Sequence, residues 1–249
     1  MSALEALAIV GVGLVAGTIN TIVGSGSLIT FPTLLAFGFK PIVANVSNTV
    51  GLVPGSLSGT VAYRRELAGQ KGRLLFLGSA SLTGGVTGAV LLLALPRSVF
   101  RHVVPVLILV ACVLVAVQPR LSRRLAARRR APHHGGKSLF ATIYATGVYG
   151  GYFGAAQGVI LMSLLGIFLD DHLQRLNAAK NVLALVTNAV SALVFVAVTH
   201  IAWEAAACIA GGSVVGGQIG GVLGRRLPAG LLRVVIIVVG VTAASVLLA

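Results

Sequence analysis

Long apolar runs separated by short polar breaks fill the chain, and this pattern predicts membrane-spanning helices. A helix rises 1.5 Å per residue, so about 20 apolar residues cross the ~30 Å hydrocarbon core of a bilayer. Strands are not expected, because an open sheet edge would leave backbone groups unpaired in lipid. The runs of the first half are 4–23, 27–38, 42–62, 74–95 and 99–117. Those of the second half are 138–155, 158–169, 173–199, 205–224 and 229–248.

Two of these runs, 27–38 and 158–169, are too short to cross a bilayer alone. Each follows a longer run after a small turn, so we interpret each pair as a broken hairpin that turns near the membrane midplane. The two turns are Gly24-Ser25-Gly26-Ser27 and Ala156-Gln157-Gly158.

The sequence also aligns with itself without a gap when it is shifted by 132 residues. Gly26 then meets Gly158, and Asn45 meets Asn177. Repeats of this kind indicate a duplicated structural unit. The predicted units are a first repeat at 1–117, a basic linker at 118–132 and a second repeat at 133–249. The predicted fold is an all-α polytopic membrane protein of two inverted repeats. Each repeat is a broken helical hairpin plus three transmembrane helices, about 8–10 membrane segments in all.

Composition supports a membrane protein. Hydrophobic residues make up 57% of the chain and charged residues 10%, against about 25% in ordinary soluble domains. The net charge of +14 would suggest nucleic acid in a soluble protein. Here the basic residues lie between apolar runs, with no stacking aromatic residues among them. We therefore expect no nucleic acid partner, but basic loops that set the topology and contact anionic lipid headgroups.

The distribution of Lys and Arg selects a topology. With residues 63–73 and the linker in the cytoplasm, and each hairpin returning to its starting side, 15 basic residues lie inside and three outside. If each hairpin were a single crossing, the split would be 11 against seven. The first arrangement inverts the second repeat relative to the first and places both termini outside. The linker is then a solvated cytoplasmic loop.

Glycines recur at every fourth position in two helices, at Gly51, Gly55 and Gly59 and at Gly212, Gly216, Gly220 and Gly224. Such a face either allows one element to slide over another or lets two helices pack closely, and close packing is favoured.

The residues that usually carry catalysis or bind metals are poorly placed for either task. The five carboxylates and the five histidines all lie at or near segment ends or in the linker. No nucleophile is near a plausible base. We therefore expect that the protein is not an enzyme and has no catalytic residue, metal site or cofactor.

Polar side chains instead cluster at equivalent places in the two repeats. Asn45, Asn48 and Thr49 begin one run, and Asn177, Lys180 and Asn181 lie in another. Lys180 lies nine residues after Asp171 at the segment end, so a helical rise would place it about 14 Å into the membrane. An ammonium and amides beside the helix N-termini that follow the hairpin turns suggest an anion site. The alternative is that Lys180 caps a carbonyl or reaches the membrane surface, while the amides join helices. The candidate substrate-binding residues are Ser25, Gly26, Ser27, Asn45, Asn48, Thr49, Gln157, Gly158, Asn177, Lys180 and Asn181.

At these residues the chain resembles the TauE/SafE sulfite exporter family, also called the toluene sulfonate uptake permease family. The stretches that carry the resemblance are VGSGSLITFPTLLAFGFKPIVANVSNTVGLVPG, GYFGAAQGVILMSLLGIF and NAAKNVLALVTN. The family pattern is a glycine-rich turn followed by an apolar stretch and a small-residue element. Ser25 and Ser27 stand where glycine is usual. The resemblance implies a multi-pass protein of the bacterial inner membrane that moves sulfur oxyanions, organosulfonates or related organic anions.

The leading hypothesis is a secondary transporter of a small anion such as sulfite or sulfoacetate, working by alternating access at a midplane site. No nucleotide-binding motif is present in the sequence, which favours a secondary mechanism. An anion channel and a membrane scaffold that transports nothing are the alternatives. A coupling ion such as H⁺ and a homo-oligomer are compatible with the pattern, and the sequence does not select between import and export.

Overall fold

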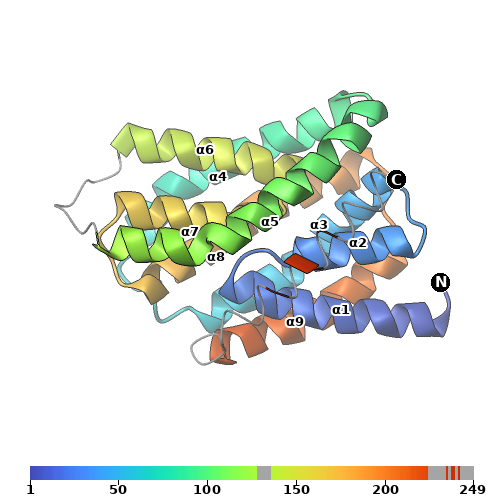
Figure 1. Ribbon diagram of the computed structural model, residues 1–249, viewed down its shortest axis with the longest axis horizontal. Helices are drawn as coiled ribbons and strands as arrows, with labels where there is room; N and C mark the ends of the chain where they lie inside the picture. Colours follow the sequence, from blue (N-terminus) through green and yellow to red (C-terminus); the bar gives the residue numbers. More distant parts are fainter. Residues whose placement is uncertain (128–135, 224–233, 235–236, 239–240, 242–249) are drawn as a thin grey trace.

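The computed structural model describes residues 1–127 and 136–223 together with Val234, Ile237, Val238 and Val241 (Figure 1). All regular elements in this part of the chain are α-helices. They are α1 (Ala3–Ile22), α2 (Ser27–Ala36), α3 (Pro41–Ala62), α4 (Lys71–Ala94), α5 (Arg97–Ala127), α6 (Gly136–Tyr152), α7 (Gln157–Phe168), α8 (Leu173–Val198) and α9 (Trp203–Leu223). The predicted run at 229–248 and the end of the linker lie outside the described residues, apart from the four isolated valine and isoleucine residues.

Local sequence explains where several helices begin. Ser2 and Glu5 form a capping box at the start of α1, in which each side chain accepts a hydrogen bond from the other residue's backbone N–H. Pro41 stands at the first turn of α3, where its missing N–H costs nothing. These signals fix helix starts on one side of the molecule.

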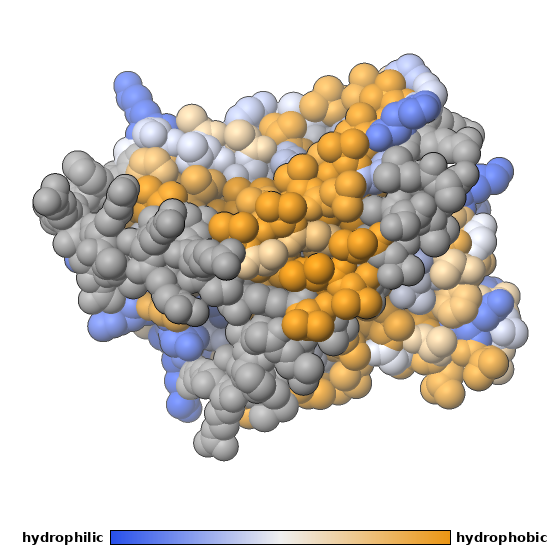
Figure 2. Space-filling model, viewed as in Figure 1, coloured by the Kyte–Doolittle hydropathy of each residue, from blue (hydrophilic) through white to orange (hydrophobic). Residues whose placement is uncertain are grey.

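Five stretches of the described chain are long and apolar enough to cross a membrane. They are Ala3–Ile22, Lys71–Ala94, Ser98–Val117, Leu173–Val198 and Trp203–Val222. Apolar side chains cover the middle of the face shown in Figure 2, and hydrophilic residues gather toward the ends of the long axis. The predicted all-helical, multi-pass membrane protein is confirmed.

The helices form two groups, and each group combines elements from both halves of the chain. In one group α9 packs on α1 and α3, and in the other α4 packs on α6 and α8. The groups meet where α3 packs on α8 (Figure 1). As a result, the long helices α3 and α8, which carry the two predicted polar clusters, lie at the centre of the molecule.

Close backbone approach explains the glycine faces. A Cβ added to Gly216 would lie 2.0 Å from the carbonyl oxygen of Leu14 on α1. One added to Gly55 would lie 2.5 Å from the side chain of Ser213 on α9. Any larger residue would force these helices apart, so close helix packing accounts for both faces. Gly224 lies outside the described residues.

The two short helices form hairpin arms, as expected. Residues 23–26 join α1 to α2, and residues 153–156 join α6 to α7. Gly24 has φ +86°, a left-handed conformation that glycine adopts at no steric cost. The two hairpin tips touch, because the N–H of Gly158 donates to the carbonyl oxygen of Gly24 at 3.0 Å. A Cβ on Gly158 would lie 2.4 Å from the Cα of Gly24, so only glycine allows this contact.

The predicted linker loop is wrong in its first part. Helix α5 continues to Ala127, so residues 118–127 are helical rather than loop. The sequence of this stretch is rich in Leu, Arg and Ala, which are strong helix formers. A charge-rich composition therefore marks the end of the apolar span without ending the helix.

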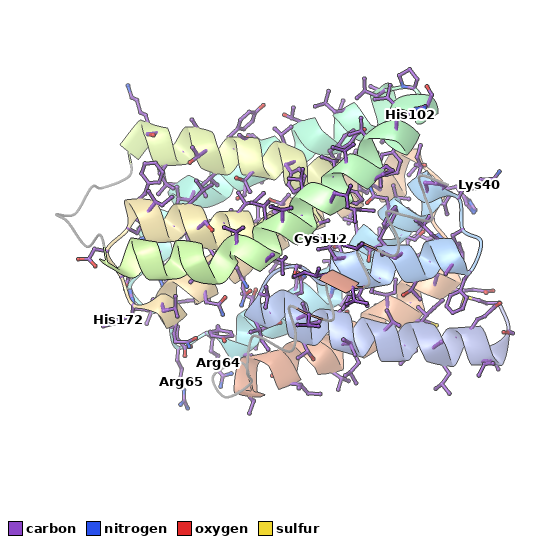
Figure 3. All side chains as sticks on the ribbon, viewed as in Figure 1. Lys40, Arg64, Arg65, His102, Cys112 and His172 are labelled. Atoms are coloured by element: carbon purple, nitrogen blue, oxygen red, sulfur yellow. The ribbon has the colours of Figure 1, made fainter. Side chains whose placement is uncertain are left out.

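The connections sort to opposite ends of the molecule (Figure 3). Arg64, Arg65 and His172 lie at one end, and Lys40 and His102 lie at the other. We call the first the basic end, because the α3–α4 connection and the first turns of α4 and α8 there carry Arg64, Arg65, Lys71, Arg73 and Arg175. The start of α1 and the α2–α3 and α8–α9 connections gather at the opposite end, where they line a common pocket.

Candidate functional site

Lys180 is held in the middle of the molecule on α8, with an exposed fraction of 1%. Its Nζ donates hydrogen bonds to the carbonyl oxygens of Asn20 at 3.2 Å and Thr21 at 3.1 Å. Both carbonyls belong to the last turn of α1, where backbone oxygens lack intrahelical partners and carry partial negative charge. Lys180 therefore caps the end of α1. An ammonium has three N–H donors, so one remains for another acceptor.

Two amides on α8 accompany this lysine. The Asn177 side chain donates to the carbonyl oxygen of Thr21 at 3.3 Å. Asn181 is buried, and its Nδ2 has no hydrogen-bond partner. An unpaired buried donor costs about 1–3 kcal/mol, so Asn181 has unused capacity for an acceptor.

A small cavity lies beside these groups. Its volume is about 10 Å³, room for the centre of about one water molecule. Its lining residues are Asn20, Thr21, Ser56, Asn181 and Ala184. The cavity is polar but closed to anything larger than water, so a larger anion could enter only if these helices moved.

The first cluster, on α3, has different partners. Asn45 donates to the carbonyl oxygen of Tyr152 at 3.1 Å, which lies at the end of α6. The side-chain oxygen of Asn48 accepts a hydrogen bond from the Thr30 hydroxyl on α2. The Thr49 hydroxyl donates to the carbonyl oxygen of Asn45 within its own helix. The Asn48 bond joins α3 to the first hairpin, the Asn45 bond joins α3 to the second hairpin, and this cluster contains no cation.

The hairpin tips hold two more unpaired polar atoms. The Ser25 hydroxyl and the Gln157 Nε2 are buried and make no hydrogen bond. Ser27 is only half-buried and begins α2. Gly26 faces the carbonyl oxygen of Ala16, from which an added Cβ would lie 2.4 Å. Gly26 and Gly158 thus let backbone approach backbone.

The structure brings together one part of the predicted set. Asn177, Lys180 and Asn181 converge on the end of α1, and Gly158 meets the first hairpin tip at Gly24. Asn45, Asn48 and Thr49 bind other groups. Sequence reasoning missed Asn20, Thr21 and Ser56, which line the cavity beside Asn181. The only signal for Asn20 and Thr21 was polar residues at the end of an otherwise apolar run.

Among the described residues, Lys180 has no carboxylate partner. The ion pairs found there use Asp171, in the α7–α8 connection, and Glu204, in the first turn of α9, at opposite ends of the molecule. The same part of the chain contains no cluster of His, Cys, Asp and Glu that could hold a metal ion. The arrangement can therefore offer an acceptor-rich ligand one ammonium proton and amide donors, in a setting of low dielectric constant.

Comparisons with known proteins agree on one family. The family described as sulfite exporter TauE/SafE matches residues 9–247. The probable membrane transporter protein YfcA of Escherichia coli K12 is 26% identical over 245 residues, covering 95% of this chain and 87% of that protein. A probable membrane transporter protein of Haemophilus influenzae is 27% identical over 211 residues, covering 84% and 81% of the two chains. The probable membrane transporter protein ORF9 of Sinorhizobium sp. is 26% identical over 242 residues, covering 94% and 89%. No solved structure gives a significant match.

Proposed function

Because the chain belongs to the sulfite exporter TauE/SafE family and is a multi-pass membrane transporter, we propose that it is a secondary transporter of a small anion. The substrate class we propose is a sulfur oxyanion, an organosulfonate or a related organic anion. The binding site is the group of Asn177, Lys180 and Asn181 at the end of α1, near the midplane of the bacterial inner membrane.

Lys180 is the single observation that carries this proposal. A charged side chain at the bilayer centre costs about 2.5–3.5 kcal/mol on insertion scales. The α1 carbonyls compensate only part of a full positive charge, since a helix end carries about half an elementary charge. A bound anion would supply the rest. It would use the third N–H of Lys180 and the unpaired Nδ2 of Asn181.

The packing supports the proposed inverted repeats. A shift of 132 residues turns the pair α1 and α9 into the pair α6 and α4, and the pair α3 and α9 into α8 and α4. Two units that exchange equivalent contacts in this way can rock against each other around a fixed centre, as alternating access requires. With the basic end in the cytoplasm, the N-terminus lies outside.

Flux measured with purified protein in liposomes tests the proposal. Sulfite, sulfate, thiosulfate, sulfoacetate, taurine and small carboxylates would each be offered as the internal or external solute. We expect flux of at least one anion that saturates with concentration and depends on the protein. Flux equal to that of empty liposomes for every anion would contradict transport and favour a scaffold. A current that does not saturate would favour a channel.

A further inference from the structure

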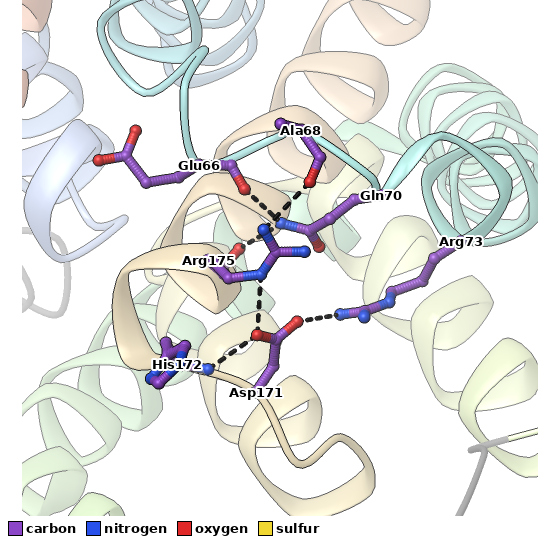
Figure 4. Close-up of polar contacts among 7 residues, drawn as sticks. All are labelled: Glu66, Ala68, Gln70, Arg73, Asp171, His172 and Arg175. Carbon is purple, nitrogen blue, oxygen red and sulfur yellow. Dashed lines mark hydrogen bonds and ion pairs between the residues drawn. The ribbon is translucent and has the colours of Figure 1, made fainter.

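A group of ion pairs and hydrogen bonds, here called the clamp, joins the α3–α4 and α7–α8 regions at the basic end (Figure 4). Asp171, in the α7–α8 connection, accepts from Arg73 at the start of α4 at 3.0 Å and from Arg175 at 2.9 Å. Arg175 also donates to the carbonyl oxygen of Ala68 at 3.0 Å. The Gln70 amide donates to the carbonyl oxygens of Glu66 at 2.8 Å and Arg175 at 3.2 Å. Three of these contacts join the first half of the chain to the second. They are Arg73 with Asp171, Arg175 with Ala68, and Gln70 with Arg175.

The carboxylate of Asp171 is charged at neutral pH. Burial by itself would raise the pKa of the Asp171 carboxyl. The hydrogen bonds from the His172 N–H and Arg73, together with the nearby charge of Arg175, outweigh burial and hold that pKa below its ordinary value. The side chain is only 12% exposed, so its ion pairs are screened less than surface pairs.

The opposite end has no such clamp at the equivalent positions. A shift of 132 residues relates Asp171 to Phe39, Gln70 to Ala202 and Arg73 to Ala205. All three of these line a pocket of about 460 Å³. Its other lining residues are Met1, Glu5, Phe37, His200, Ile201, Trp203 and Glu204. The equivalents of three clamp residues thus line open space here.

One wall of this pocket contacts α3 beside the first polar cluster. At its wall, the backbone N–H of Ala202 donates to the Ser47 hydroxyl at 2.9 Å, and Ser47 is the neighbour of Asn48 on α3. The ion pair at this end joins the Met1 ammonium to Glu204 at 3.4 Å. It links the starts of α1 and α9, not the two connections, and the Glu204 side chain is 76% exposed. It therefore does not close the pocket.

We propose that these two equivalent junctions are the two gates of the transporter, in a state with the basic-end gate closed and the opposite gate open. The inference rests on the proposed function. A carrier must never open both gates at once, and two inverted repeats can exchange the roles of equivalent junctions. Conversion to the opposite state separates the α3–α4 and α7–α8 connections, breaks the ion pairs of Asp171 and closes the pocket around Ala202.

Reversible cross-linking of the clamp tests the inference directly. Ala68→Cys and His172→Cys place exposed thiols on the two connections and leave every side chain of the clamp intact. The background lacks Cys112 and Cys208. A flexible, reducible thiol-to-thiol reagent then joins the two loops in liposomes. We expect loss of most anion flux on cross-linking and its recovery on reduction. Each single-cysteine variant, treated in the same way, should keep its flux.

A second measurement does not depend on transport. Cysteine at Ala202 should react readily with an impermeant thiol reagent from the pocket side. Asp171→Asn removes the clamp charge, so we expect it to favour the opposite state and slow this labelling. If cross-linked protein transports at the uncross-linked rate, or if Asp171→Asn leaves the labelling rate unchanged, the gate assignment is overturned. Absence of flux in the wild type, together with state-dependent labelling, would instead count against the proposed function alone.

Discussion

The two hairpins end in equivalent places, but their helix ends are satisfied differently. At the end of α1, backbone carbonyls accept from the Asn177 amide and from the Lys180 ammonium. At the end of α6, the Tyr152 carbonyl accepts from the Asn45 amide. The residue equivalent to Lys180 is Asn48, which binds Thr30 instead. One hairpin therefore has a cation at its tip, and the other has only neutral groups.

This difference indicates which features of the hairpin tips the fold needs and which it does not. The second hairpin shows that a broken hairpin in this fold can form with an amide and no cation at its end. The fold therefore does not require a lysine at the first hairpin, and burying its charge is unfavourable. A bound anion would neutralise that charge. The following variants test the comparison.

Breaking the contact between the two tips should have the largest effect on stability. Gly158→Val would place a Cβ 2.4 Å from the Cα of Gly24, where neither backbone can move freely. We expect a loss of about 3 kcal/mol or more, seen as a large fall in Tm or as failure to fold. Gly78→Val is the matched control, because the space beside Gly78 on α4 is open. If the two variants were equally stable, the tips would not touch as described.

Removing the neutral bond of the first cluster should have an intermediate effect. Thr30→Val deletes the hydroxyl that donates to Asn48 and leaves a buried amide oxygen unpaired. We expect destabilisation of about 1–3 kcal/mol, measured by thermal unfolding in detergent. Thr33→Val removes only a bond to the carbonyl of Ile29 within the same helix, so it should cost less. Equal losses would mean that Asn48 and Thr30 do not join α2 to α3.

Truncating the amides at the two helix ends should have the smallest effect on stability, and it should affect anion affinity at only one of the two ends. Asn45→Ala and Asn177→Ala each remove one hydrogen bond to a helix-end carbonyl. We expect similar losses of stability, about 1 kcal/mol each. Only Asn177→Ala should also weaken anion binding, because only the α1 end has the lysine beside it. Equal effects on affinity would place the ligand at both tips.

Much of the fold was predictable because helix formation in lipid depends on local composition. The runs 27–38 and 158–169 correspond closely to α2 and α7, and both pair with the preceding helix as expected. The end of α5 was not predictable from hydropathy, since the charged residues at 118–127 end the apolar stretch without ending the helix. The 132-residue repeat stays a prediction that the packing supports.

The candidate site was only partly predictable, because hydrogen bonds depend on how helices align in space. The place of Lys180 within a long apolar helix could be read from its position along the run. Its bonds to Asn20 and Thr21 depend on where the first hairpin turns relative to α8, which no local pattern encodes. Asn48 and Lys180 occupy equivalent positions in the repeat but bind different groups, and this difference also depends on how the helices align in space. Equivalent positions in a repeat need not share a ligand.

Anion affinity of Lys180→Gln tests the central claim most directly. Gln keeps a long side chain that can still donate to the α1 carbonyls, but it lacks the charge. Calorimetry on purified protein, with an anion that saturates flux, would compare it with the wild type and with Lys40→Gln, an exposed lysine at the opposite end. Losing one charge-assisted contact is worth about 1.5–3 kcal/mol, so we expect binding about 10- to 150-fold weaker in Lys180→Gln and unchanged in Lys40→Gln. Wild-type affinity in Lys180→Gln would show that the lysine only caps α1 and that the anion binds elsewhere.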